Sequence, residues 1–170
     1  MRASRASRLP ALVVGAILAL AVGVAPAAAG VLDDVARIAV SVEIEHPVDG
    51  LVADALERRL TAFLADLAPP LPRDDASPDR LRLNVSVQPH SSSALRGYYL
   101  PFSGTYAIGS VRLSVERTVQ LPGRASRTVP AIVWQRERAV ATRRAEADAA
   151  VEGAVAELLE TLKTAVFDRR

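Results

Sequence analysis

The stretch Arg37-Ile38-Ala39-Val40-Ser41-Val42-Glu43-Ile44-Glu45 decides how the rest of the chain is interpreted. Every even position from Ile38 to Ile44 is apolar, while the odd positions carry Arg, Ala, Ser and Glu. Because successive side chains of a strand point to opposite faces, this alternation predicts a strand with one buried and one polar face. Such a strand does not lie between two layers of helices, so we expect helices on one face of its sheet only.

A helix is expected directly after this strand. From Leu51 the apolar residues change to helical spacing, and the expected buried stripe is Val52, Leu56, Leu60, Phe63 and Leu67. Asp49 is a suitable N-cap for this helix, because its carboxylate can accept hydrogen bonds from free amides of the first turn. The helix should end before Pro69, since proline cannot continue the hydrogen-bond ladder.

Three further strands and a second helix complete the expected order. Alternation predicts strands over residues 80–88, 106–121 and 129–142. Within the second of these, Arg117 interrupts the inward register and marks either a bulge or the edge of the core. The last segment, 143–167, is expected to be helical, with an apolar stripe formed by Val151, Val155, Leu158, Leu162 and Val166.

The order β-α-β-β-β-α predicts the fold class. We expect an α+β two-layer sandwich, in which a mainly antiparallel four-stranded sheet carries both helices on one face. The first two strands are joined through a helix, so a right-handed crossover can make them parallel neighbours.

Residues 1–29 have the features of a secretory signal peptide. Three arginines precede the uncharged apolar run 9–24, and Ala27-Ala28-Ala29 supplies the small residues of an A-x-A cleavage site. Cleavage after Ala29 would leave residues 30–170 as a single α/β domain in the periplasm, without a transmembrane span. The alternative is an uncleaved membrane anchor, because the uncharged run up to Ala29 approaches the ~20 residues that a spanning helix requires.

Composition excludes several classes of protein. The chain contains no cysteine, so it has neither disulfides nor the lipidated cysteine of a bacterial lipoprotein. Residues 30–170 hold 18 basic and 19 acidic side chains, a formal charge of −1. Since nucleic-acid binding depends on neutralising phosphates, we do not expect a nucleic-acid partner. We expect no cofactor either, and the composition leaves the oligomeric state open.

The order of elements resembles that of several small bacterial envelope proteins. These are the outer-membrane lipopolysaccharide-assembly lipoprotein, the auxiliary lipoproteins of lipid-transporting ABC systems, and the periplasmic fold of the curli-secretion lipoprotein. The resemblance covers most of residues 30–170 as an order of elements, without a shared motif, and this chain lacks the anchoring cysteine of those proteins. It implies an accessory role in the envelope and transfers no site residue.

The connection between the second and third strands is the main candidate for binding. Residues 95–106, which we call the aromatic loop, contain four of the seven aromatic residues of the chain. Aromatic rings provide large contact areas, and tyrosine adds a polar tip. We expect a non-enzymatic protein that binds an envelope protein or lipid through Arg96, Tyr98, Tyr99, Phe102 and Tyr106. The alternative is that these rings fold back and cover an open edge of the sheet.

Two other functions stay open. His46 and His90 each end a strand, and parallel strands would bring both to the same end of the sheet, where a small metal-dependent or hydrolytic enzyme could use them. Their spacing matches no zinc motif. A soluble carrier of small ligands is the other alternative, and it would need an apolar cavity between helices and sheet.

Overall fold

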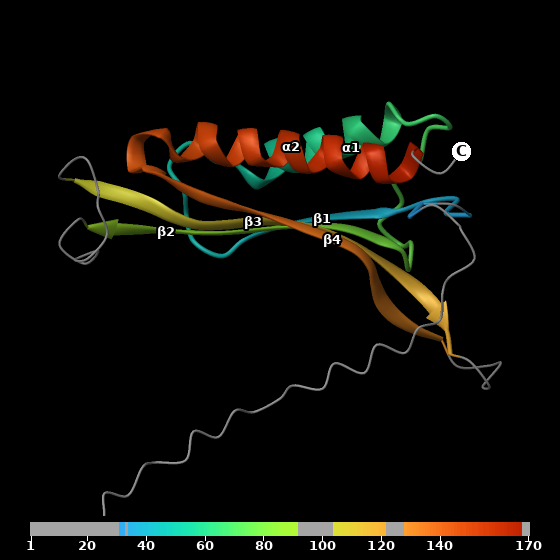
Figure 1. Ribbon diagram of the computed structural model, residues 1–170. Helices are drawn as coiled ribbons and strands as arrows, with labels where there is room; N and C mark the ends of the chain where they lie inside the picture. Colours follow the sequence, from blue (N-terminus) through green and yellow to red (C-terminus); the bar gives the residue numbers. More distant parts are fainter. Residues whose placement is uncertain (1–30, 33, 92–103, 122–127, 168–170) are drawn as a thin grey trace, which may run out of the picture.

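The computed structural model describes residues 31, 32, 34–91, 104–121 and 128–167. Their elements are β1 (Ala39–Ile44), α1 (Ala53–Ala65), β2 (Arg80–Ser91), β3 (Thr105–Gln120), β4 (Thr128–Arg143), the short 3₁₀ helix η1 (Arg144–Glu146) and α2 (Ala147–Phe167). Both helices lie on the same face of the sheet (Figure 1). The predicted α+β two-layer sandwich, with the order β-α-β-β-β-α, is therefore confirmed.

The four strands lie side by side in the order β1-β2-β3-β4. β1 is parallel to β2, with Ala39 opposite Arg80 and Ile44 opposite Val85. The other two neighbouring pairs are antiparallel hairpins. The parallel first pair agrees with the prediction, because α1 carries the chain back across the sheet before β2 begins.

The core lies between the sheet and the two helices. The sheet contributes the inward positions of β2 and β3, which are Leu81, Leu83, Val85, Val87, Val111, Leu113 and Val115. The helices contribute Leu56, Leu60 and Leu64 from α1 and Val151, Val155, Leu158 and Leu162 from α2. All of these are at most 2% exposed, so each side chain contributes about 1.5–3 kcal/mol to folding. The stripe predicted for the second helix is buried, with Val166 partly so.

The predicted start and stripe of the first helix were partly wrong. Val52 is 55% exposed, whereas Leu64, which the predicted stripe omitted, is 1% exposed. Asp49 is not the N-cap: the helix begins after Val52, which has no side-chain cap. Asp49 instead lies in a turn closed by the hydrogen bond from the Leu51 amide to the Val48 carbonyl. This turn places the aspartate too far from the amides of the first helical turn.

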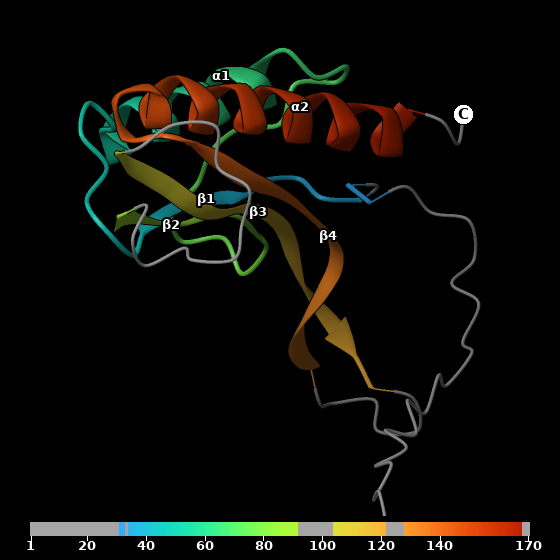
Figure 2. The same ribbon diagram turned by 60° about the vertical axis from the view of Figure 1, so that its left-hand side comes forward.

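The irregularity predicted at Arg117 lies at the edge of the core. Val115 of β3 is opposite Trp134 of β4 and Glu116 is opposite Ile132, so the extra residue of the bulge is on β4. β2 begins opposite Glu116, and from Arg117 onwards β3 pairs with β4 alone. This two-stranded ribbon bends away from the helices (Figure 2), as expected where a bulge increases the local twist.

Candidate functional site

The aromatic loop connects two strands at one end of the sandwich. Ser91 and Thr105 form the last pair of the β2–β3 hairpin, and this hairpin continues past the end of β1, which pairs with β2 only as far as Val85. We call this end of the molecule, formed by residues 45–50, 86–91, 104–108 and 143–148, the loop end. Four of the five predicted binding residues, Arg96, Tyr98, Tyr99 and Phe102, lie outside the described residues.

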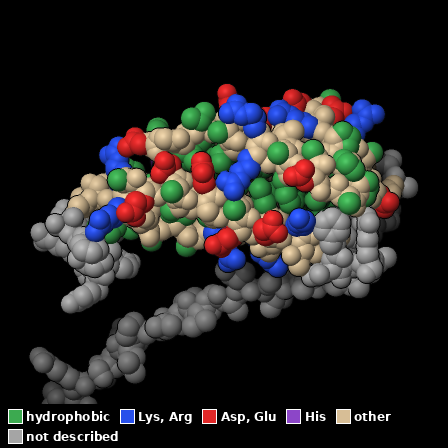
Figure 3. Space-filling model, turned by 90° about the horizontal axis from the view of Figure 1, so that it is seen from above, with side chains coloured by type: hydrophobic (Ala, Val, Ile, Leu, Met, Phe, Trp, Pro, Cys, Tyr) green, Lys and Arg blue, Asp and Glu red, His purple; other side chains and the backbone are tan. Residues whose placement is uncertain are grey.

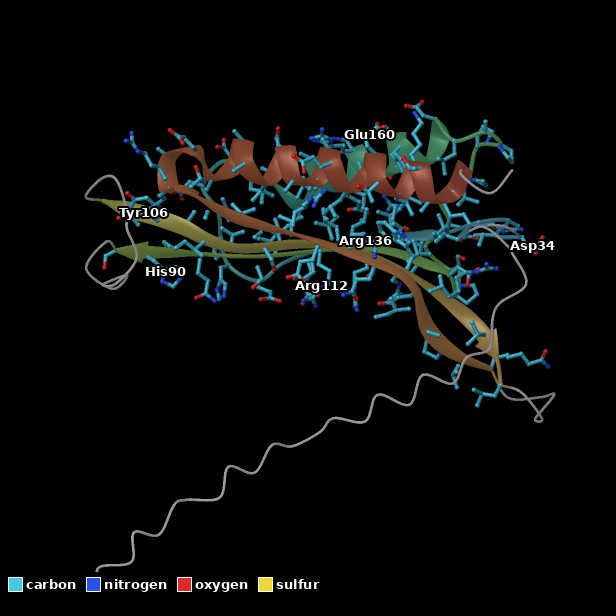
Figure 4. All side chains as sticks on the ribbon, in the orientation of Figure 1. Asp34, His90, Tyr106, Arg112, Arg136 and Glu160 are labelled. Atoms are coloured by element: carbon cyan, nitrogen blue, oxygen red, sulfur yellow. The ribbon has the colours of Figure 1, made fainter. Side chains whose placement is uncertain are left out.

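Tyr106 is the fifth predicted binding residue, and it lies at the start of β3. It is opposite His90 of β2 and Arg143 of β4, and Figure 4 shows it close to His90 at the loop end. Because it is only 7% exposed, most of its side chain is inaccessible to a partner. Its position makes it a fixed support at the root of the aromatic loop.

Polar side chains tie β1 to β2 at the loop end. The Glu45 carboxylate accepts hydrogen bonds from Ser86 Oγ at 2.5 Å and from Asn84 Nδ2 at 3.1 Å. These hydrogen bonds, that of Ser86 first, hold the pKa of Glu45 below its ordinary value of 4.5. The carboxylate is therefore ionised at neutral pH and stays an acceptor for both strands.

Both histidines lie at the loop end, although the described residues form no reactive centre around them. His46 Nε2 lies 2.6 Å from Gln88 Nε2, and His90 follows two residues later in β2. Ser86 donates to the Glu45 carboxylate and not to an imidazole, so neither histidine activates it as a nucleophile in this arrangement. The described residues also contain no group of three or more His, Asp or Glu side chains able to hold a metal ion.

The connection between β1 and α1 contacts η1 and the first turn of α2. Arg144 donates to Asp49 through both Nε and an NH₂ group, at 3.0 and 2.9 Å. Gly50 has a φ of +84°, and a Cβ there would lie 2.9 Å from Asp148 Oδ2. The positive φ favours glycine at this position, because residues with a side chain rarely adopt it.

A small cavity lies beneath these contacts. Its volume is about 20 Å³, and Val48, Val87, Ala107 and Ala147 are among its walls. This space is sufficient for about one water molecule. This cavity therefore has room for a water molecule and not for a larger ligand.

Sequence reasoning found some of these contacts and missed others. Alternation already placed Asn84, Ser86 and Gln88 on the polar face of β2, but which side chains meet Glu45 depends on the register between strands. The pair of Asp49 and Arg144 joins residues 95 positions apart. Its only signal in the sequence was the density of arginines around the junction of the last strand and helix.

Comparison with known proteins assigns no function. The sequence matches no family model, and no curated protein is significantly similar to it. Within the described ranges, neither α1 nor α2 combines the length and apolar character that crossing a membrane requires. Seen from above the helices, acidic and basic side chains are intermixed and not separated into patches of one sign (Figure 3).

Proposed function

We propose that this protein is an exported, non-enzymatic accessory protein of the cell envelope that binds a protein or lipid partner through its aromatic loop. The observation that carries the proposal is the place of the loop. Its roots, Ser91 and Thr105, are the last pair of a hairpin that continues past β1. The aromatic loop is therefore attached at the end of the sandwich that lies beyond β1, and we infer that a partner binds there.

The composition of the loop suits such contacts. Tyr98, Tyr99 and Phe102 supply rings with a large contact area and few rotatable bonds, so their ordering costs little entropy. Arg96 supplies a cation with several hydrogen-bond donors, and Arg, like Tyr, is common among the residues that dominate binding energy. These four residues are the contacts that we assign to the partner, with Tyr106 supporting them from the root of the loop.

The contacts at the loop end support the proposal by holding the roots of the loop in place. Glu45 joins β1 to β2, and Asp49 joins the following connection to η1 through Arg144. A rigid base reduces the conformational entropy that is lost when a partner binds.

The first experiment is photocrosslinking in the native periplasm. A photoreactive phenylalanine analogue replaces Tyr99, and the same analogue at Ile132, which is 58% exposed at the far end of β4, serves as the control. We expect a discrete adduct from position 99 that is absent from position 132. The mass of the recovered protein checks export, because cleavage after Ala29 predicts a chain that begins at Gly30.

The second experiment separates binding from folding. The double substitution Tyr98→Ser and Tyr99→Ser should abolish capture of the crosslinked partner and leave the thermal unfolding curve unchanged. The control, His46→Ala with His90→Ala, should retain capture if the histidines have no part in binding. If the tyrosine variant unfolds, the rings belong to the core, and if it folds and still captures the partner, the loop is not the binding site. Either result overturns the proposal.

A further inference from the structure

The end of the sandwich opposite the loop end contains an apolar cavity of about 240 Å³. Its walls come from three parts of the chain: Leu32, Val35 and Ala36 before β1, residues 67–71 after α1, and Val166 near the end of α2. Every described residue of this lining has an apolar side chain. Figure 1 shows that α2 runs from the loop end to this end, and its 21 residues correspond to about 30 Å.

The cavity reaches from the surface into the core. Leu32, Leu67 and Leu71 are buried, at 9%, 6% and 8% exposed, and they form its floor. Ala36 and Ala68 are exposed and form part of its rim. An elongated apolar group can therefore enter from solvent and end against the leucines of the core.

The size and chemistry of the cavity indicate an apolar ligand. The side chains that the described residues contribute to the walls are all apolar, so any hydrogen bond to a bound water would have to come from backbone groups. An engineered cavity of about 150 Å³ with similar apolar walls stays dry and binds benzene or xenon. The present cavity is larger and open at one side, which suits the end of a chain better than a closed, compact molecule.

We propose that this cavity binds the end of one aliphatic chain of a lipid or fatty acid. The position of the cavity supports this occupant: Leu32 follows the uncharged run 9–29 by only three positions. During the proposed export the uncharged run would be held in the membrane, and only three positions then separate it from Leu32 in the wall of the cavity. The inference therefore rests on the export proposed above, whereas the site itself is separate from the aromatic loop.

The charges near the cavity predict that the hydrocarbon alone is recognised. Arg37 pairs with Asp74 at 3.1 Å, and Arg73 pairs with Glu57 and Asp75. Because both arginines already have carboxylate partners, neither is available to select an anionic headgroup. We expect dodecanoate and 1-dodecanol to bind with affinities within about threefold of each other.

The test measures binding to the full chain. The fluorescent fatty acid cis-parinaric acid serves as the probe, and dodecanoate and 1-dodecanol serve as competitors. Ala36→Phe places a ring in the mouth of the cavity at an exposed position and should weaken probe binding at least tenfold. Ala55→Phe, at an exposed alanine of α1 that does not line the cavity, is the matched control and should bind like the parent.

Several results would overturn this proposal. One is the absence of saturable binding, and another is equal binding by the Ala36→Phe variant and the parent while thermal unfolding shows both folded. Val166→Asp gives a second check from α2, since a carboxylate in the wall should also expel the chain. If binding appears only when Leu12→Asp and Leu18→Asp disrupt the apolar run, the occupant is the protein's own N-terminal segment and not a lipid.

Discussion

Gly109 provides the sharpest test of the sheet at the loop end. It lies in β3 directly opposite Val87 of β2. A Cβ at this position would overlap the carbonyl oxygen of Ser86 and lie 2.7 Å from the Cα of Val87. Both are backbone atoms of β2, which is paired with β3 here, so they cannot rotate away as the end of a flexible side chain would.

The cost of Gly109→Ala can be estimated from these contacts. Carbon atoms in contact prefer about 3.5–4.0 Å, so β2 would have to move by about 1 Å. Overpacking of this kind costs about 1–3 kcal/mol, and each ladder hydrogen bond lost in the movement adds about 1 kcal/mol. We expect a loss of about 3 kcal/mol in the free energy of unfolding, which lowers Tm by about 10 °C for a domain of this length.

The assay is urea unfolding followed by circular dichroism, with Gly153→Ala as the control. Gly153 lies in α2, and a Cβ there has no atom within 4 Å. The same chemical change should therefore stabilise the protein by about 0.5–1 kcal/mol, because alanine is the better helix former. A Gly109→Ala variant within about 0.5 kcal/mol of the parent would refute the close approach of β2 and β3 at this position.

Three further predictions concern the core, the loop end and its ion pair. Leu83→Ala should cost about 2–5 kcal/mol because Leu83 is fully buried, whereas Ile132→Ser at an exposed site should change stability by less than about 0.5 kcal/mol in the same urea assay. The pKa of Glu45 is lowered in the folded state, so the stability that its hydrogen bonds contribute is present above pH 4.5 and is lost as the pH falls through the folded pKa. Glu45→Gln should therefore reduce the difference in unfolding free energy between pH 7 and pH 3, and an unchanged difference would contradict this assignment. A double-mutant cycle on Asp49 and Arg144 should give a coupling energy below about 1 kcal/mol in the free energy of unfolding, since both side chains are largely exposed. A coupling energy above about 2 kcal/mol would contradict this and show that the pair is shielded from solvent.

The parts of the fold that follow from local geometry were predictable from the sequence. The alternation in residues 37–45 and 80–88 reflects the period of two in a strand, and it identified the buried positions of β2. In β1 it identified Val40, whereas Ala39 is buried as well and the predicted Val42 and Ile44 are only partly buried. The stripe of α2 was predicted for the same reason, because its period of 3.6 is set by the backbone of the helix itself. The start of α1 was not predicted correctly. It depends on the turn at Gly50, and the spacing of apolar residues does not reveal that turn.

From the sequence, the candidate site could be predicted only as a stretch of residues, without the contacts between the strands beside it. Its concentration of tyrosines and the absence of a catalytic or metal-binding motif are visible in the sequence. That Glu45 bonds to Ser86 and Asn84 depends on the register of β1 against β2. A shift of one residue would turn these side chains to opposite faces of the sheet, so the pairing cannot be read from either strand alone.

The sequence by itself determined the order of elements, the inward positions of β2 and the apolar stripe of α2, because these properties depend on residues close together in the chain. Only the tertiary structure decided that Asp49 meets Arg144, that the core ends where β2 begins opposite Glu116, and that an apolar cavity lies between Leu32, Leu71 and Val166. Each of these features joins segments far apart in sequence. Their contacts depend on how the helices pack against the sheet, and the local spacing of residues does not determine that packing.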